Sequence, residues 1–309
     1  MASSDTAPTI VAPTTWSLAH LSDLHLTDPL AGAGVRLRGK QWLGRISWRR
    51  RRIHIHQPAV LSALVTDLRA QSPAHVAISG DLVQLGLPHE FEQAADWLAR
   101  FVPPAQLMLV PGNHEAYLPG SWPQGQDHWR PYLIETPQGE PSLQRRDKLL
   151  LIGLSSAVPT LAGLASGTLG SAQLQALETA LAQGASEGLF RVVVLHHPAA
   201  PDLVGWRKHL TDQRQFAAVI ARQGAGVILH GHAHRTTLSR LPGPHGPVAV
   251  IGAPSASALD TRPGRMAGYN LLRIEQLGRD WQMQLGRRTY RPHTRDFEWL
   301  EHCNLTSSG

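Results

Sequence analysis

The sequence feature that most constrains this chain is a recurring pattern in which metal-ligand side chains follow a short apolar run. The pattern occurs five times, at Asp23-Leu24-His25, Gly80-Asp81, Asn113-His114, His196-His197 and His232-Ala233-His234. A short apolar run is typical of a buried strand, and polar side chains directly after it lie at the strand end. The pattern therefore predicts a sheet with carboxylate, amide and imidazole side chains gathered at its strand ends.

Asp81 is predicted to lie at the centre of these clusters. It follows the apolar residues 75–78, and Gly80 lets the backbone turn tightly, so the carboxylate stands just past a strand end. Asp23 and His25 are two residues apart, so in an extended backbone they face the same way and can chelate one metal ion. A carboxylate placed among the other four clusters could bridge two metal ions.

Helix and strand signals alternate between residues 58 and 110, which predicts βαβ units with a parallel sheet. Helices are expected at 58–68, 90–101, 171–183 and 211–223, and strands at 16–21, 75–78, 106–110, 149–154, 191–195 and 226–229. Four C-terminal stretches, at 236–240, 248–251, 269–275 and 281–288, are interpreted as antiparallel strands that complete a second sheet.

We expect a disordered leader over residues 1–15, one domain over 16–300 and a tail over 301–309. The domain includes a basic insertion at about 30–56 and a long loop at about 116–147 that follows Asn113 and His114. The loop carries Tyr117, Trp122 and Trp129 among prolines and glycines. Long loops beside ligand clusters are often functional, so it is interpreted as a substrate rim; the alternative is that its aromatic side chains pack against the body.

The basic insertion is free of acidic residues, since none occurs between Pro29 and Thr66. One interpretation is a solvated surface, because runs of charge usually face water. The other is an arm, over residues 36–52, that contacts anionic lipid headgroups or a large phosphorylated substrate. Nucleic acid is not expected, because no recognition motif accompanies the charge. His54 and His56 are interpreted as surface or packing residues. The cationic and apolar residues are Arg36, Arg38, Lys40, Arg45, Arg49, Arg50, Arg51 and Arg52 with Trp42, Leu43, Ile46 and Trp48.

Composition narrows the cellular and chemical setting. The net charge of +6 over 309 residues favours anionic partners such as phosphate esters or an acidic membrane surface. Cys303 is the single cysteine, so an internal disulfide and a thiolate metal cluster are excluded. Residues 1–15 lack a basic segment followed by an apolar one, and the chain lacks an apolar run long enough to cross a membrane. We expect a cytoplasmic protein, peripheral to the inner membrane face if the basic arm binds lipid.

The five clusters in their order, D-x-H, G-D, G-N-H-E, H-H-P and G-H-x-H, resemble the calcineurin-like metallophosphoesterase superfamily over residues 16–255. Segments 194–198 and 229–234 are most similar to its bacterial phosphodiesterase-type members, the class III cyclic nucleotide phosphodiesterases and glycerophosphodiesterases. The resemblance implies an α/β (α+β) fold, a four-layer αββα sandwich of two mixed sheets flanked by helices. The metal site would lie at the C-terminal ends of the strands.

The resemblance also implies two adjacent divalent metal ions, of which Mn, Fe or Zn suit imidazole and carboxylate ligands. His114 would be catalytic, contacting the phosphoryl oxygen or protonating the leaving alcohol; the alternative is that it only orients Asn113. One ion would be held by Asp23, His25 and His234, the other by Asn113, His196 and His232, and Asp81 would bridge both.

The function implied is a dinuclear metal-dependent hydrolase of phosphoesters, foremost a phosphodiesterase in which a metal-bridging hydroxide attacks phosphorus in line. One alternative is a phosphomonoesterase, or a pyrophosphatase acting on a nucleotide- or lipid-linked substrate. Another is a metal-bound interaction scaffold without catalysis. His114 beside a complete ligand set argues against the scaffold, because a protein without catalysis has no need of that side chain.

Overall fold

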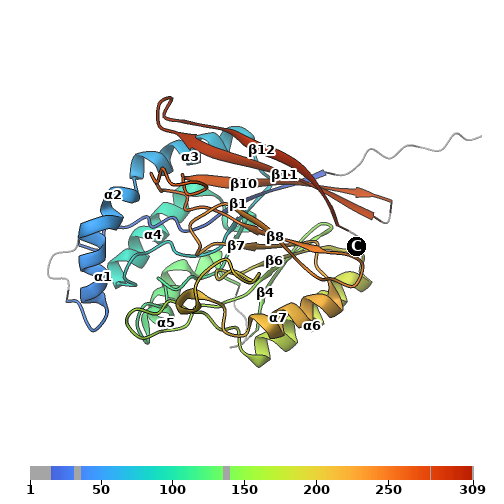
Figure 1. Cartoon of the computed structure of the whole chain (residues 1–309), viewed down its shortest axis with the longest axis horizontal. Coiled ribbons are helices and arrows are strands. Elements are labelled where there is room, and N and C mark those ends of the chain that lie inside the picture. Colours follow the sequence, from blue (N-terminus) through green and yellow to red (C-terminus); the bar gives the residue numbers. More distant parts are fainter. Residues whose placement is uncertain (1–14, 31–35, 135–139, 279, 308–309) are drawn as a thin grey trace, which may run out of the picture.

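The computed structural model describes residues 15–30, 36–134, 140–278 and 280–307, which form two mixed sheets packed face to face between layers of helices (Figure 1). The strand order is β12-β11-β10-β1-β2-β3 in the first sheet and β4-β5-β6-β7-β9-β8 in the second. The predicted α/β sandwich of two mixed sheets is therefore confirmed. The predicted disordered leader lies outside the described residues, apart from Thr15, which begins β1.

The strands that carry the site run parallel within each sheet. In the first sheet β1, β2 and β3 are parallel neighbours, and in the second β5, β6, β7 and β9 are. The first sheet contains β1 (Thr15–Leu21), β2 (His75–Ile78), β3 (Leu107–Leu109), β10 (Gly268–Leu277), β11 (Asp280–Arg291) and β12 (Asp296–Ser307). The second contains β4 (Ser142–Arg146), β5 (Leu149–Gly153), β6 (Phe190–Val194), β7 (Val227–His230), β8 (Thr237–Leu241) and β9 (Val248–Gly252).

Four long helices form the outer layers. The first sheet is covered by α3 (Pro58–Gln71) and α4 (Pro88–Phe101), and the second by α6 (Ser171–Ser186) and α7 (Gln213–Gln223). Pro58 and Pro88 each open a helix, where a missing N–H costs no hydrogen bond. The shorter elements are α1 (Gln41–Ser47), a π-helical turn (Trp48–Arg52), α2 (Ile53–Ile55), α5 (Ser121–Gly125) and the 3₁₀ turns Pro104–Gln106, Gln126–Tyr132 and Trp206–Lys208.

Three apolar layers separate the four layers of secondary structure. Alternation along the strands produces them, because successive side chains point to opposite faces of a sheet. In β1, Leu18 packs between the two sheets while Ala19 packs under the helices. In β6, Val192 and Val194 lie between the sheets and Val193 faces α6 and α7. Both sheets are thus buried on two faces, which is why their parallel strands read as continuous apolar runs.

The C-terminal strands differ from the prediction. Only β8 and β9 belong to the second sheet, and β9 is parallel to β7. The strands β10, β11 and β12 form an antiparallel meander that extends the first sheet, because β10 pairs with β1 from Thr15↔Glu275 to His20↔Asn270. Apolar alternation specifies which face of a strand is buried but not which sheet it joins, so the sequence left this choice undetermined.

One further boundary differs from the prediction, and two aromatic side chains of the predicted rim loop pack against the body. The segment 301–307, expected as a tail, belongs to β12, which pairs with β11 through contacts such as Leu285↔Cys303. In the loop predicted as a substrate rim, Trp129 is fully buried and its indole N–H donates to the Phe91 carbonyl at 3.0 Å. Trp122 packs beside it at a ring separation of 5.6 Å. These aromatic side chains anchor the loop to α4, which is the packing alternative.

Candidate metal centre

The side chains predicted to bind metal follow five parallel strands that end at the same edge of the sandwich. Asp23 and His25 follow β1, Asp81 follows β2, and Asn113 follows β3. From the second sheet, His196 follows β6, and His232 and His234 follow β7. The loops after β1 and β2 are tied together, since the Asp23 N–H donates to the Gly80 carbonyl at 2.9 Å and the His25 N–H to the Asp81 carbonyl at 3.0 Å. The structure therefore brings all seven side chains together.

The backbone is strained at five of the seven predicted metal ligands. A positive φ is unusual for a residue with a Cβ, and such strain gathers at functional sites because the surrounding structure holds it in place. Gly112 is needed beside them, because a Cβ there would lie 2.3 Å from Asp81 Oδ1. Five of the seven predicted ligands have φ between 47° and 64°, namely Asp23, His25, Asp81, His232 and His234.

One group of side chains on the first-sheet side could hold a metal ion. It contains Asp23, His25, Asp81 and His234, whose candidate ligand atoms all lie within 4.8 Å of one another. His234 Nε2 is 3.0 Å from Asp23 Oδ1 and 3.5 Å from His25 Nε2. Carboxylate oxygens and imidazole nitrogens converging at this spacing form the kind of ligand set that binds a first-row divalent ion.

A second group, formed by Asp81, His196 and His232, lies beside the first. His196 Nε2 is 3.3 Å from Asp81 Oδ2, 3.2 Å from His232 Nδ1 and 3.1 Å from Asn113 Oδ1. Asp81 is the side chain common to both groups. This is the placement that the predicted bridging of two metal ions by Asp81 requires.

The surroundings of the buried Asp23 carboxylate indicate whether a cation fits the site. Its Oδ2 accepts the His232 N–H at 2.9 Å, whereas its Oδ1 is out of contact with water and faces His234 Nε2 at 3.0 Å. A divalent cation held between this oxygen and the imidazole would coordinate both. Burial raises the pKa of Asp23, but His234 and His196 together outweigh it, so the pKa lies below its usual value and the carboxylate is anionic.

Two of the histidines are oriented by backbone carbonyls. His196 Nδ1–H donates to the Ser79 carbonyl at 2.7 Å, and His25 Nδ1–H donates to the Val83 carbonyl at 3.2 Å. In the neutral ring, donation from Nδ1 leaves the lone pair on Nε2, which is the atom each ring presents to its cluster. These contacts hold the imidazoles in the tautomer that a metal ion requires.

Glu115 organises the loops beneath the site, a role that the sequence reasoning did not assign. Its Oε2 accepts the N–H groups of Gly112 at 2.6 Å and Asp81 at 2.9 Å, and its Oε1 accepts those of Leu82 at 2.7 Å and Val83 at 3.1 Å. Burial, and then the charge of Asp81, raise the pKa of Glu115 to about 7. A buried carboxylate that joins the loops after β2 and β3 fixes where Asp81 stands.

His114 lies at the mouth of the clusters. Its backbone N–H donates to Asp81 Oδ1 at 2.9 Å, and its Nε2 is 3.9 Å from Asp81 Oδ2. Its Nδ1 donates to the Gln84 carbonyl, and Arg52 Nη1 lies 3.4 Å from the same nitrogen. Burial lowers the pKa of His114 to about 4. Because the Gln84 carbonyl engages Nδ1, Nε2 is the ring nitrogen left for a substrate, with Arg52 Nη1 at 3.5 Å.

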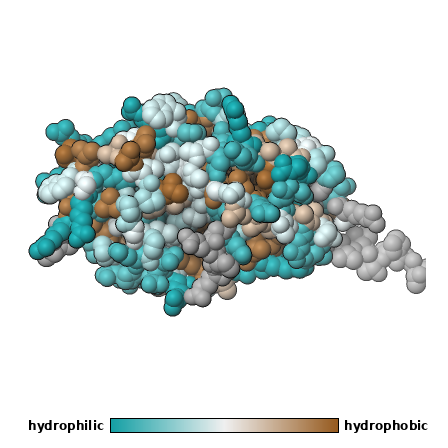
Figure 2. Space-filling view, turned by 90° about the horizontal axis from the view of Figure 1, so that it is seen from below, coloured by the Kyte–Doolittle hydropathy of each residue, from teal (hydrophilic) through white to brown (hydrophobic). Residues whose placement is uncertain are grey.

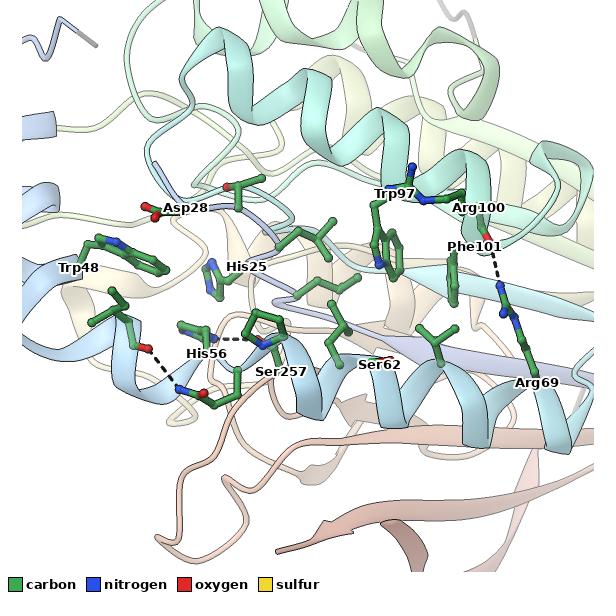
Figure 3. A pocket seen from close by; sticks show the side chains of 18 residues that line it. His25, Asp28, Trp48, His56, Ser62, Arg69, Trp97, Arg100, Phe101 and Ser257 are labelled. Carbon is green, nitrogen blue, oxygen red and sulfur yellow. Dashed lines mark hydrogen bonds between the residues drawn. The ribbon is translucent and has the colours of Figure 1, made fainter. Parts of the chain in front are cut away.

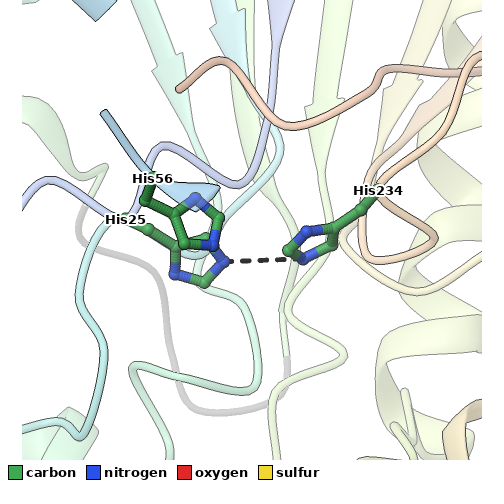
Figure 4. A group of neighbouring side chains, drawn as sticks. All are labelled: His25, His56 and His234. Atoms are coloured by element: carbon green, nitrogen blue, oxygen red, sulfur yellow. Dashed lines mark hydrogen bonds between the residues drawn. The ribbon is translucent and has the colours of Figure 1, made fainter. Parts of the chain in front are cut away.

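His56 is part of the site, although the sequence analysis interpreted it as a surface or packing residue. Its ring lies 4.3 Å from that of His25 and 5.9 Å from that of His234, and these three side chains form a further group that could hold a metal ion (Figure 4). Its Nδ1 is 2.9 Å from the Ser257 hydroxyl. No ligand motif surrounds His56 in the sequence, so only the fold reveals its place beside His25.

A cationic cleft of about 510 Å³ opens above the clusters. His114, His232 and His234 form part of its floor. The remaining wall is rich in positive charge and would attract an anionic substrate. The cationic lining residues are Arg51, Arg52, Lys208, Arg235, Arg262 and Arg265.

Comparison with known proteins agrees with this geometry. Residues 17–236 match the family model described as calcineurin-like phosphoesterase. The chain belongs to this family. A probable cyclic nucleotide phosphodiesterase from Synechococcus sp. is 29% identical over 277 residues, which cover 88% of this chain and 92% of that protein. A second such protein, from another Synechococcus strain, is 30% identical over 127 residues, covering 39% of this chain and 43% of that one.

Two solved structures share the fold. A dimetal phosphatase from Danio rerio superposes with a TM-score of 0.62 at 14% identity, covering 95% of this chain and 99% of that one. A purple acid phosphatase from yellow lupin seeds superposes with a TM-score of 0.60 at 11% identity, covering 96% and 54%. As a calcineurin-like phosphoesterase, the chain is a hydrolase of phosphoric esters from a family that depends on a dinuclear metal centre. The predicted family and reaction class are confirmed.

Proposed function

We propose that this calcineurin-like phosphoesterase hydrolyses phosphodiesters with two metal ions held at the strand ends. Asp23, His25 and His234 would hold one ion, and Asn113, His196 and His232 the other, with Asp81 contacting both. The observation that carries the proposal is the sharing of Asp81 between two groups of carboxylate and imidazole ligands. Mn, Fe or Zn suits this nitrogen and oxygen ligand set.

The chain's own residues then position the phosphoester. Two divalent ions bound there would supply a water of lowered pKa and would stabilise negative charge on the phosphoryl oxygens. Arg52, which reaches the same cleft as His114, would bind a phosphoryl oxygen. The Gln84 carbonyl holds the His114 ring with Nε2 towards the cleft, from where it would contact the phosphoryl group or pass a proton to the leaving oxygen.

Preference for a diester is supported by the relative from Synechococcus, whose name is that of a cyclic nucleotide phosphodiesterase. The test compares hydrolysis of bis-p-nitrophenyl phosphate with that of p-nitrophenyl phosphate by the manganese-loaded enzyme. A higher kcat/KM for the diester supports the proposal, whereas a higher value for the monoester makes the protein a phosphomonoesterase. Absence of turnover with both, and with a panel of natural phosphoesters that includes cyclic nucleotides and glycerophosphodiesters, would establish the non-catalytic scaffold.

A second candidate function is hydrolysis of a pyrophosphate linkage in a nucleotide- or lipid-linked substrate. The cationic lining of the cleft favours this candidate. Arg51, Lys208 and Arg235 supply more positive charge than one phosphodiester monoanion needs for pairing. Release of a phosphomonoester from a nucleoside diphosphate conjugate, measured beside the two chromogenic substrates, distinguishes the candidates. Faster turnover of the conjugate than of every simple diester would favour the pyrophosphatase.

We also propose that the outer face of α1 contacts an anionic membrane surface. Trp42, Leu43 and Ile46 are 53%, 58% and 47% exposed, and Arg49 and Arg50 are exposed beside them. Figure 2 shows apolar and hydrophilic side chains mixed at its left end, the end at which α1 lies in Figure 1. Exposed apolar side chains with cations suit the boundary between headgroups and acyl chains. None of the described helices is long and apolar enough to cross a membrane.

Sedimentation with vesicles of phosphatidylserine and phosphatidylcholine tests the membrane contact. Changing Arg49 and Arg50 together to Gln is expected to weaken sedimentation while diester hydrolysis stays unchanged. Arg51 and Arg52 are left intact because they line the cationic cleft. Absence of vesicle binding by the unaltered protein would contradict the proposal.

A further inference from the structure

An apolar cavity of about 560 Å³ lies between α3 and α4, beside the candidate metal centre (Figure 3). Its central stretch is lined by Leu26, Leu61 and Val65, whose side chains offer no hydrogen-bond partner. Trp97 and Phe101 continue the wall along α4 and stack on each other at 4.4 Å. Nothing in the chemistry proposed for the metal centre uses this space.

The cavity is elongated along α3. The α3 residues that line it recur every three to four positions, so they occupy one face of the helix over three turns. From Gln57 at one end to Arg69 at the other, a rise of 1.5 Å per residue gives a length of roughly 18 Å. Figure 3 shows His25 and His56 towards one end, and Arg69 with Arg100 at the other. The lining positions of this helical face are Gln57, Pro58, Leu61, Ser62, Val65 and Arg69.

This apolar cavity adjoins the cationic cleft at the candidate metal centre. His25 and His56 line both spaces. The segment formed by the π-helical turn and α2 separates them elsewhere, because Trp48 and Ile53 line the apolar cavity whereas Arg51 and Arg52 line the cleft. A molecule whose phosphate lies over the clusters would therefore have an apolar space on one side and a cationic space on the other.

We propose that the apolar cavity receives the alkyl chain of an amphiphilic phosphoester, a lipid-type substrate whose phosphate lies in the cationic cleft. The inference rests on the proposed function, since it assigns the substrate class of the same site. An alkyl chain fits the lining because Leu26, Leu61 and Val65 present carbon atoms alone along the middle of the cavity. A nucleobase beside Leu26, Leu61 and Val65 would find no hydrogen-bond partner in those three side chains, which is unfavourable for its ring nitrogens.

Binding of alkylphosphonates to the manganese-loaded protein tests the inference without requiring turnover, because the carbon–phosphorus bond is not a phosphoester. Isothermal titration calorimetry would compare ethylphosphonate with dodecylphosphonate, kept below its micelle concentration. Full burial of one methylene favours binding by ~4-fold. Because the cavity is open on one side, we expect dodecylphosphonate to bind about a hundredfold more tightly than ethylphosphonate.

Two variants test whether the alkyl chain of the ligand lies in the apolar cavity. Ser62 is exposed and lines the cavity, so Ser62→Trp would fill it from the surface of α3 and is expected to lower the affinity for dodecylphosphonate by about tenfold or more, leaving ethylphosphonate unchanged. Val65→Asp is expected to act in the same way by placing a charge against the chain. Ala59→Trp is the matched control, because Ala59 is exposed on the same helix and is not among the lining residues.

Equal affinity of the unaltered protein for the two phosphonates, or equal loss of both in Ser62→Trp, would overturn the inference. Hydrolysis of bis-p-nitrophenyl phosphate by the same preparation keeps this outcome separate from the proposed function. If the protein hydrolyses the diester but its affinity for phosphonates does not depend on chain length, the lipid substrate is rejected and the proposed phosphodiesterase activity is retained. Chain-dependent binding without hydrolysis of any phosphoester supports the alkyl site and removes the proposed catalysis.

Discussion

Replacement of Glu115 by Gln is expected to weaken both the fold and the metal centre. Each carboxylate oxygen of Glu115 accepts two backbone N–H groups. Whichever oxygen becomes an amide NH₂, two buried N–H groups lose their acceptor. Each loss costs roughly 1–3 kcal/mol, but Gln does not carry the desolvation cost that raises the pKa of Glu115, so we expect a net loss of about 3 kcal/mol. For a chain of this size that corresponds to a fall in Tm of roughly 6 °C.

The metal affinity should fall in the same variant, because two of the four N–H groups belong to Asp81 and Gly112. Loss of a side chain that orients a ligand typically weakens metal binding by about 10- to 100-fold. Differential scanning calorimetry of the metal-free protein would give the change in stability. Competition for Mn²⁺ against a chelator would give the change in affinity.

Glu90→Gln provides the matched control. Glu90 is a buried carboxylate whose Oε1 accepts from the Thr27 hydroxyl at 2.7 Å and the Gln84 N–H at 2.8 Å, and whose Oε2 accepts from Leu85 and Leu87 at 2.9 and 3.0 Å. Its change to Gln should lower stability by a similar amount, but none of these donors lies on a predicted ligand, so Mn²⁺ affinity should hold. Equal loss of metal affinity in both variants would refute the reasoning about Glu115.

Three further outcomes are expected. Asp81→Ala should remove both metal ions whereas His234→Ala removes one, as elemental analysis of the purified variants would show; an Asp81→Ala protein that retains two tightly bound ions contradicts the shared position. His114→Ala should lower kcat by about 10²–10⁴-fold while both ions remain bound, and unchanged turnover would exclude His114 from the mechanism. His20→Gln should flatten the acid side of the stability profile. Burial, and then the charge of His230, lower the pKa of His20 to about 3, so the unfolded chain binds one more proton than the folded chain below pH 6.5. Stability is thus lost as pH falls from 6.5 towards 3, and urea unfolding should show a slope smaller by about 1.4 kcal/mol per pH unit in the variant; an unchanged slope would contradict the assignment.

The convergence of the seven predicted ligands could be foreseen because every one follows a strand. Parallel neighbours in an α/β sheet end at one edge, so a polar cluster after each strand places the clusters together without knowledge of their distances. Asp81 was expected at the centre on this ground, and the structure places it in both ligand groups. The strand order of the C-terminal meander had no comparable signal, because β10 is buried on both faces and its alternation fits either sheet.

The place of His56 could not be foreseen for a related reason. It occupies the corner between α2 and α3, and its ring is set by Ser257, which is 201 residues away in the sequence. The apolar cavity depends equally on distant segments, since Leu26, Val65 and Trp97 come from three different elements. A sequence pattern reports the face on which a side chain lies, but a cavity depends on how far apart two packed elements stand.

The arginines of the basic insertion do not form one uniformly solvated run. Arg49 and Arg50 are exposed, whereas Arg52 is half-buried and its partners in the described part of the chain include the neutral groups Gln84, Gly44, Tyr117 and His114 Nε2. Burial lowers the pKa of Arg52, against the opposing effects of Tyr117 and of the charges of Asp81 and Glu90. A half-buried guanidinium that is not bonded to a carboxylate is poorly stabilised. A bound anion would stabilise it. The phosphate of a substrate would supply that anion, so under the proposed function the insertion would serve the reaction through Arg52.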